Sequence, residues 1–222
     1  MQTIVIYSSQ TGNTRKLATQ IFAAIPGDSK DLKNIDEYRE KDAELYFVGF
    51  WVDRGDCDEK TVELLSGLHG KKIALFGTCG MGNDPAYYQK VIDRVKTWIP
   101  EDNEYMDAFL CQGKMPIQVR RRYEEMAKSG QNTEQIQAMI RNFDRAMLHP
   151  DRADEAAAAD FAVQVWKRIG SRRAIQCAAP FGATKYKDHF FTCKMQKSPL
   201  LLKLSVVYTT QSNLQREGDF LW

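Results

Sequence analysis

The chain lacks the features that mark membrane, secreted and metal-binding proteins. No apolar run approaches the roughly 18 residues needed to cross a bilayer, and no basic leader with a cleavage site stands at the start of the sequence. The five cysteines include no Cys-x-x-Cys pair, and the three histidines are scattered without the spacing of metal ligands. We therefore expect a cytoplasmic protein with reduced thiols, no disulfide framework, no metal and no membrane partner.

The chain also has little net charge, although the balance differs between its parts. Residues 1–169 carry 23 basic and 26 acidic side chains, a net charge of −3, whereas residues 170–222 carry 8 basic and 3 acidic ones, a net charge of +5. This local change of sign indicates two parts with different partners or histories. The one run of three arginines, Arg120 to Arg122, is followed by two glutamates. The run could mark a site for nucleic acid or for an acidic partner, but the glutamates one turn on are typical of a solvated helix face. We favour the solvated face and expect no nucleic-acid partner.

Short β-prone runs alternate with helical patterns along residues 1–170, which we predict to form one domain. The expected strands are 2–7, 30–32, 44–50, 71–76 and 104–111, and the expected helices are 13–25, 58–68, 85–98 and 154–169, the last ended by Gly170. Strands that alternate with helices form right-handed βαβ units and a parallel sheet. We therefore predict an α/β fold: a doubly wound five-stranded parallel sheet in the order 2-1-3-4-5, with helices on both faces. Its ligand crevice lies at the carboxyl ends of strands 1 and 3.

Two segments do not fit this alternation. Residues 112–150 exceed the usual strand-to-helix connection of about two to six residues, and their pattern predicts an insertion of two helices, 117–127 and 133–148. Residues 171–222 contain one β-prone stretch, 200–210, and no further α/β pattern. Two interpretations of this extension stay open: a partner-binding segment, or a segment with no evolved fold, such as an out-of-frame read-through.

The most informative motif is Ser-Ser-Gln-Thr-Gly-Asn-Thr at residues 8–14. It follows a strand pattern and precedes a helical one, so hydroxyls and free backbone N–H groups gather at a helix N-terminus, which favours an anion. A Walker A loop would need a lysine followed by serine or threonine after its last glycine, and a dinucleotide loop would need three spaced glycines. The motif therefore predicts a site for a single terminal phosphate. The alternative is an ordinary hydroxyl-rich helix cap.

This motif resembles the FMN-phosphate loop of flavodoxins. Residues 51–56 and 77–84 follow the next two central strands, where flavodoxins place the two loops that flank the isoalloxazine ring. The combination of Gly-Phe-Trp-Val-Asp, Phe-Gly-Thr and Phe-Leu-Cys-Gln-Gly-Lys-Met resembles short flavodoxin-like proteins of anaerobic gut bacteria, some of which are associated with bilirubin reduction. The resemblance implies FMN as the cofactor and the following binding residues: Ser9, Gln10, Thr11, Gly12, Asn13, Thr14, Trp51, Val52, Asp53, Thr78, Cys79, Gly80, Met81 and Gly82.

Two features depart from the flavodoxin pattern. Flavodoxins commonly have a glycine directly after the stacking aromatic residue, whereas Val52 follows Trp51 here and Gly55 comes three residues later. The domain is also less acidic than most electron carriers of this type, so a strongly negative face contributes less to the steering of partners.

The function implied by the resemblance is electron transfer between a reductase and a partner oxidoreductase, with FMN carrying out the redox chemistry. No catalytic side chain is required. Cys79 and Cys111 have no nearby histidine and no Cys-x5-Arg pattern, so we expect them to be small buried residues. Two alternatives stay open: an FMN-dependent NAD(P)H:quinone or azo reductase, and a flavin-free interaction module. The sequence leaves the redox partner and the oligomeric state open.

Overall fold

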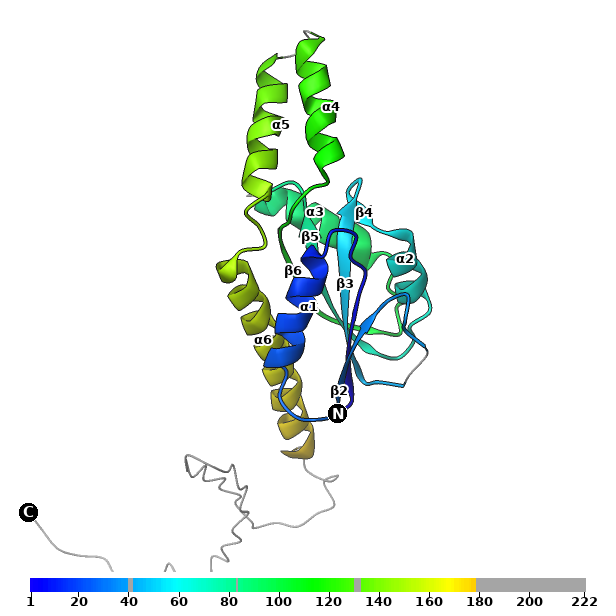
Figure 1. The fold of residues 1–222 in the computed structure, drawn as a ribbon. Helices are drawn as coiled ribbons and strands as arrows, with labels where there is room; N and C mark the ends of the chain where they lie inside the picture. The colour runs from blue at the N-terminus through cyan, green and yellow to red at the C-terminus, as the bar shows by residue number, and fades with distance from the viewer. Residues whose placement is uncertain (40–41, 83, 130–132, 179–222) are drawn as a thin grey trace, which may run out of the picture. The chain divides into compact units, whose positions relative to one another are not determined.

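A parallel sheet forms the centre of the unit Met1–Ala174 in the computed structural model, which describes residues 1–39, 42–82, 84–129 and 133–178. Its order is β2-β1-β3-β5-β6, which confirms the predicted 2-1-3-4-5 sheet (Figure 1). A two-residue strand pairs antiparallel with β3 and adds to the predicted set. The strands are β1 (Thr3–Tyr7), β2 (Lys30–Asn34), β3 (Leu45–Asp53), β4 (Asp56–Cys57), β5 (Lys72–Cys79) and β6 (Glu104–Gln112).

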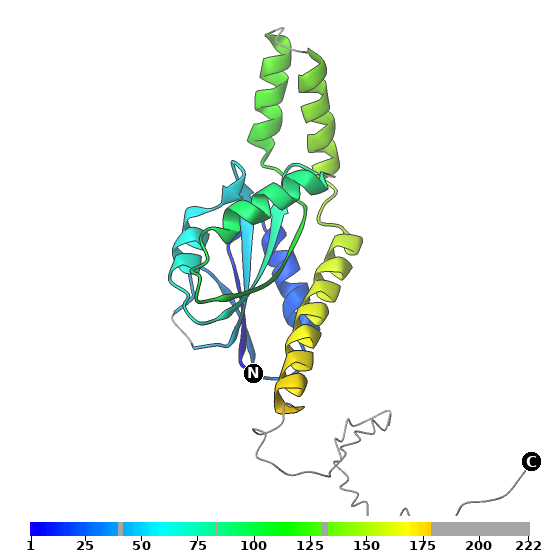
Figure 2. The ribbon, with the colours of Figure 1, turned by 180° about the vertical axis from the view of Figure 1, so that it is seen from behind.

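Helices cover both faces of this sheet, as predicted. α1 (Asn13–Ala24) and α6 (Arg152–Ala178) lie on one face, and α2 (Glu59–Ser66) and α3 (Pro85–Lys96) lie on the other (Figures 1 and 2). The start of α3 shows how the sequence sets a boundary: the Asp84 carboxylate accepts a hydrogen bond from the backbone N–H of Tyr87 at 3.0 Å, and a proline occupies the first turn.

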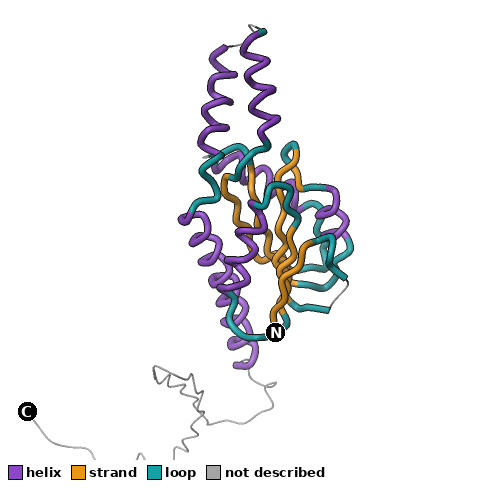
Figure 3. Tube along the Cα trace, in the orientation of Figure 1, coloured by secondary structure: helices purple, strands orange, loops and turns teal. Residues whose placement is uncertain are grey.

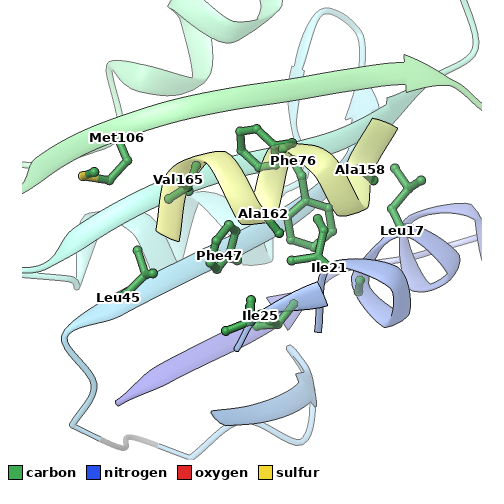
Figure 4. Close-up of a cluster of buried hydrophobic side chains, with 14 of the residues drawn as sticks. Leu17, Ile21, Ile25, Leu45, Phe47, Phe76, Met106, Ala158, Ala162 and Val165 are labelled. Atoms are coloured by element: carbon green, nitrogen blue, oxygen red, sulfur yellow. The ribbon is translucent and has the colours of Figure 1, made fainter. Parts of the chain in front are cut away.

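Two hydrophobic cores stabilise the layers. Successive side chains of β3 alternate between them: Phe47 packs toward α1 and α6, whereas Phe50 packs toward α2 and α3. Figure 4 shows the first core, where Leu17 and Ile21 of α1 meet Phe47 and the small residues of α6. Burying each large apolar side chain contributes about 1.5–3 kcal/mol. The central strands are buried on both faces, which explains their near-continuous apolar sequence.

The predicted insertion is a helical hairpin. α4 (Ile117–Lys128) and α5 (Thr133–Ala146) project from the end of the sheet at which the parallel strands finish (Figure 3). The ends of the insertion meet, because the backbone N–H of Lys114 donates to the carbonyl oxygen of His149 at 3.1 Å. Arg120 of α4 forms ion pairs with Glu124 and, across the hairpin, with Asp144. The helical hairpin is therefore an insertion between β6 and α6 whose two ends lie next to each other.

Three predicted boundaries were wrong. We expected residues 51–53 and 77–79 in loops, but residues 51–53 belong to β3 and residues 77–79 belong to β5. The two segments extend their strands because they pair with each other, as Trp51 does with Thr78. α6 continues through Gly170 to Ala178 because one glycine in a helix costs only about 1 kcal/mol and the next proline in the sequence is Pro180. No helix in the described ranges combines the length and apolarity that crossing a bilayer requires. The β-prone stretch 200–210 lies outside the described residues.

Candidate functional site

The loop between β1 and α1 presents free backbone donors. Gly12 precedes α1 in the left-handed conformation (φ +82°), which glycine adopts without steric cost. Across the described part of the chain, the backbone N–H groups of residues 9–14 donate to no protein acceptor, whereas that of Ser8 bonds to the Gly49 carbonyl at 2.8 Å. Unpaired donors at a helix N-terminus attract an anion. This is the arrangement that the predicted phosphate site requires.

The side chains of Asn13 and Thr14 are buried and bonded within the protein. Asn13 Nδ2 donates to the Lys114 carbonyl oxygen at 2.9 Å. The Thr14 hydroxyl lies 3.3 Å from the carbonyl oxygen of Phe50 and 3.1 Å from the hydroxyl of Thr78. These bonds connect α1 to β3, to β5 and to the segment after β6. The two side chains therefore position the loop, and their backbone N–H groups are the parts left for an anion.

A buried carboxylate lies beneath the same loop. Asp58 accepts a hydrogen bond from the Ser8 hydroxyl at 2.9 Å and from the Thr61 hydroxyl at 2.7 Å. Hydrogen bonds of this kind make the burial of a polar group tolerable. They also fix the start of the phosphate loop to the start of α2.

Residues 51–56 form a β-hairpin in place of the expected loop. Val52 pairs with Cys57 in the antiparallel ladder, and Arg54 and Gly55 form the turn with φ values of 50° and 86°. A β-branched residue in a paired strand does not reach positive φ without strain. The backbone at Val52 is therefore fixed, in contrast to the mobile peptide that a glycine would provide there. Trp51 remains partly exposed.

The carboxylate of Asp56 anchors this hairpin to α3. Partial burial disfavours its charge, but hydrogen bonds from the backbone of Cys57, from Arg94 Nε (2.9 Å) and from Trp98 Nε1 (3.1 Å) outweigh that effect. The pKa of Asp56 is therefore lower than that of a free aspartate.

Asn142 of α5 holds the loop after β5, and sequence reasoning missed it. Its Nδ2 donates to the Gly80 carbonyl at 3.0 Å, and its Oδ1 accepts from the backbone N–H of Gly82 at 3.3 Å. Gln112 Nε2 donates to the same Gly80 carbonyl and to Asn142 Oδ1, each at 3.1 Å. Both amide side chains are buried. No local pattern reveals this link, because the partners lie 30 to 62 residues apart.

The segment after β1, the ends of β3 and β5, and the helical hairpin α4–α5 line a pocket of about 600 Å³. Ten of the predicted site residues line it: Gln10, Thr11, Asn13, Trp51, Val52, Asp53, Thr78, Cys79, Gly80 and Met81. Ser9 lines a second pocket of about 400 Å³, which shares Gln10, Trp51 and Asp53 with the first. Gly12, Thr14 and Gly82 line neither. The insertion between β6 and α6 forms one side of the larger pocket. Its lining residues, which were not among the predicted site residues, are Lys114, Met115, Val119, Arg122, Tyr123, Met126 and Met139.

Three cysteine thiols among the described side chains are buried and unpaired. Burial raises the pKa of Cys57 to about 12 and also raises the pKa of Cys79 and of Cys111. A buried neutral thiol is a poor nucleophile. Cys79 and Cys111 are thus small buried residues, as expected.

His149, Asp151 and Asp154 lie together at the start of α6, where hydrogen bonds account for them. Asp151 Oδ1 accepts from the backbone N–H groups of Ala153 and Asp154, and Asp154 Oδ2 accepts from that of Asp151 and from His149 Nδ1. This reciprocal pattern is a capping box. The cluster therefore serves the helix end.

Comparison with known proteins identifies the family. The flavodoxin domain matches residues 4–163, which is more than half of the chain. The protein belongs to the flavodoxin domain family. Its relatives include the flavodoxin-like domain-containing protein BilS of Clostridioides difficile (strain CD3), which is 36% identical over 167 residues, covering 73% of this chain and 94% of that protein. The BilS protein of Clostridium symbiosum (strain WAL-14163) is 34% identical over 182 residues, with 73% and 95% covered.

Among solved structures, a flavodoxin from the domain Archaea is 16% identical, with a TM-score of 0.45, and the match covers 77% of this chain and 99% of that one. Family membership makes this chain a flavodoxin-type redox protein with a flavin site. The residues present fit a flavin phosphate, because the neutral backbone N–H groups of residues 9–14 have no acceptor in the described part of the chain, and Gln10, Thr11 and Asn13 of the same loop line the larger pocket.

Proposed function

We propose that this flavodoxin-family protein binds FMN and transfers electrons between a reductase and a partner oxidoreductase. The observation that carries the proposal is the set of free backbone donors of residues 9–14, at the N-terminus of α1 and beside a pocket of about 600 Å³. A phosphate monoester suits such donors. The pocket has the size in which proteins bind small molecules and cofactors.

Each side of the pocket has a distinct task in this proposal. The backbone of Ser9 to Thr14, with the hydroxyls of Ser9 and Thr11, would hold the phosphate. Trp51, Val52 and Asp53 would flank the ring on one side, and Thr78 to Met81 would contact its other edge. FMN supplies the redox chemistry when it is bound. The protein binds, orients and shields the cofactor, and no side chain has to move a proton.

The resemblance implied that Gly82 contacts FMN, whereas we propose that it supports the loop that does so. Its backbone N–H already donates to Asn142 Oδ1, so it supports the loop rather than offering a free donor to the ring. Hydrogen bonds from Gln112 and Asn142 hold the Gly80 carbonyl from the inner side of the loop. The edge that meets the ring is therefore ordered before the cofactor binds, which reduces the entropic cost of binding.

The test uses the purified full chain with added FMN. After removal of excess cofactor, retained visible flavin absorbance would support the site, and anaerobic stepwise reduction would show how electrons enter. Reduction in one-electron steps supports the carrier. Loss of all flavin from a chain whose circular dichroism shows it to be folded would refute the site and favour the flavin-free interaction module.

The methionine side chains that α4, α5 and the segment before α4 contribute to the pocket favour one second candidate, an FMN-dependent NAD(P)H:quinone or azo reductase. They are Met115, Met126 and Met139, and methionine side chains adapt to varied ligands. A nicotinamide or quinone would contact them while stacking on the cofactor. Steady turnover of NAD(P)H with a quinone by the purified protein alone would favour this candidate. Reduction only in the presence of a separate reductase favours the carrier.

A further inference from the structure

We propose that the mouth of the flavin pocket is an electropositive docking surface for an acidic redox partner protein, formed by Arg54, Lys114 and Arg122. The inference rests on the proposed electron-transfer function and adds the charge of the partner. The three cations come from separate elements: the β3–β4 turn, the segment after β6, and α4. We call them the basic rim.

The basic rim is exposed and uncompensated. All three side chains line the larger pocket and are solvent-exposed, and within the described ranges none of them forms an ion pair. Among the residues that the structure describes, Asp53 is the one carboxylate that lines the same pocket. Arg120 behaves differently, since it pairs with Glu124 and Asp144 to hold the hairpin together. The rim cations thus have no comparable structural task.

The rim has the opposite sign to its surroundings. Within the described residues, the second pocket, which shares Gln10, Trp51 and Asp53 with the first, is lined by one cation, Lys60, and by four carboxylates: Asp36, Asp53, Asp58 and Glu59. Residues 1–169 carry a net charge of −3. Positive charge is therefore concentrated on the side where α4 meets the flavin pocket, against the average of the domain.

The proposed cofactor leaves this charge free. Its phosphate is assigned to the neutral donors of residues 9–14, so the basic rim is not needed to bind it. Charged groups around a docking site steer encounter and set orientation more than they add affinity. Met81, half-exposed among the rim residues, provides an apolar contact at the same mouth. A partner that carries carboxylates around its own redox centre matches both features.

The experiment measures electron transfer to two small redox proteins of opposite charge. The full chain, loaded with FMN and reduced, is mixed in a stopped-flow instrument with oxidised rubredoxin, which is acidic, or with oxidised cytochrome c, which is basic. The local rim predicts that the rate with rubredoxin falls as salt is added. Residues 1–169, at a net charge of −3, would by themselves favour cytochrome c, but the full chain carries a net charge of +2, so the variants described below separate the rim from net charge. A rubredoxin rate that rises with salt would overturn the proposal.

Two neighbouring arginines provide a matched pair of variants. Arg122→Gln removes a rim charge, while Arg121→Gln removes the same charge from an exposed α4 position that does not line the pocket. Both variants keep residues 170–222 and have the same net charge, so a difference between their transfer rates does not come from that basic segment. We expect Arg122→Gln to slow transfer to rubredoxin by about threefold at low salt and Arg121→Gln to have a clearly smaller effect. Equal effects would show that only net charge matters and would overturn the rim.

Two further measurements separate the proposals. Flavin content is measured first, so a variant that loses FMN would assign Arg122 to the cofactor and overturn its role in docking. If the unaltered chain holds no flavin, the proposed function fails, and equilibrium binding of fluorescently labelled rubredoxin to the same variants still decides the rim.

Hexacyanoferrate(III) serves as a small anionic oxidant. If its rate alone depends on Arg122 and the rubredoxin rate does not, the site takes small anions and the protein-docking proposal is wrong.

Discussion

Replacement of Asn142 by leucine tests whether the hairpin helps to build the cofactor site. The substitution keeps a buried side chain of similar size. Besides a weak contact of Asn142 Nδ2 with Met81 Sδ (3.7 Å), it removes three hydrogen bonds with nitrogen and oxygen partners: to the Gly80 carbonyl (3.0 Å), from the Gly82 N–H (3.3 Å) and from Gln112 (3.1 Å). At about 1 kcal/mol each, the free energy of unfolding should fall by about 3 kcal/mol. Because the loop would then have to be ordered by the cofactor, we expect FMN to bind about tenfold more weakly, equivalent to about 1.4 kcal/mol.

The matched control is Asn103→Leu. Asn103 likewise donates to the carbonyls of Leu68 and Pro100 and accepts from the backbone N–H of Lys71, with a fourth, longer bond to Asp102 Oδ1 (3.4 Å). It lies just before β6, outside both pockets. Urea unfolding of the cofactor-free protein should show a comparable loss of stability in both variants. Quenching of flavin fluorescence should show weaker FMN binding for Asn142→Leu alone. Equal FMN affinities for the two variants would refute the reasoning.

Three further predictions concern single groups. Thr14→Val removes a buried hydroxyl and should lower the free energy of unfolding, measured in urea, by about 1–3 kcal/mol. Thr14→Ser keeps the hydroxyl and should largely retain the stability of the unaltered protein. A valine variant as stable as the unaltered protein would contradict the positioning role. The pKa of Asp56 is lowered in the folded state, so its charge stabilises the fold above the unfolded pKa of about 3.9, and this contribution is lost as pH falls through the folded value. Melting temperatures of Asp56→Asn should therefore fall less steeply on acidification than those of the unaltered protein, and parallel curves would rule this out. Peptide mass spectrometry after iodoacetamide treatment at mild alkaline pH should find Cys57, Cys79 and Cys111 unlabelled until urea is added, and labelling in the native state would show that these thiols are accessible.

The sheet could be predicted from sequence because each strand and helix carries its own periodic signal. Two of the three boundaries that failed, at the ends of β3 and β5, depend on pairing between distant segments. Trp51 extends β3 because Thr78 lies beside it, and Val52 stays extended because the chain turns back at Arg54 to place Cys57 opposite. Neither partner is visible in the local pattern of polar and apolar residues.

The candidate site divides in the same way. The phosphate loop is a contiguous motif, so its residues could be named in advance. The roles within it could not, because the buried side chains of Asn13 and Thr14 find partners 36 to 101 residues away. Arg122 lines the pocket, and Asn142 contacts the loop after β5, because the inserted helices α4 and α5 stand at the strand ends. Their spacing from the motif carries no information about that contact.

The hydrogen bond between the Lys114 N–H and the His149 carbonyl has an evolutionary consequence. The chain leaves the α/β unit and returns to it at almost the same point, so α4 and α5 can be lengthened, exchanged or deleted without rethreading the sheet. Insertions that begin and end at neighbouring positions are tolerated well. The hairpin is thus a replaceable module, and selection for a different partner can act on it while the phosphate loop stays unchanged.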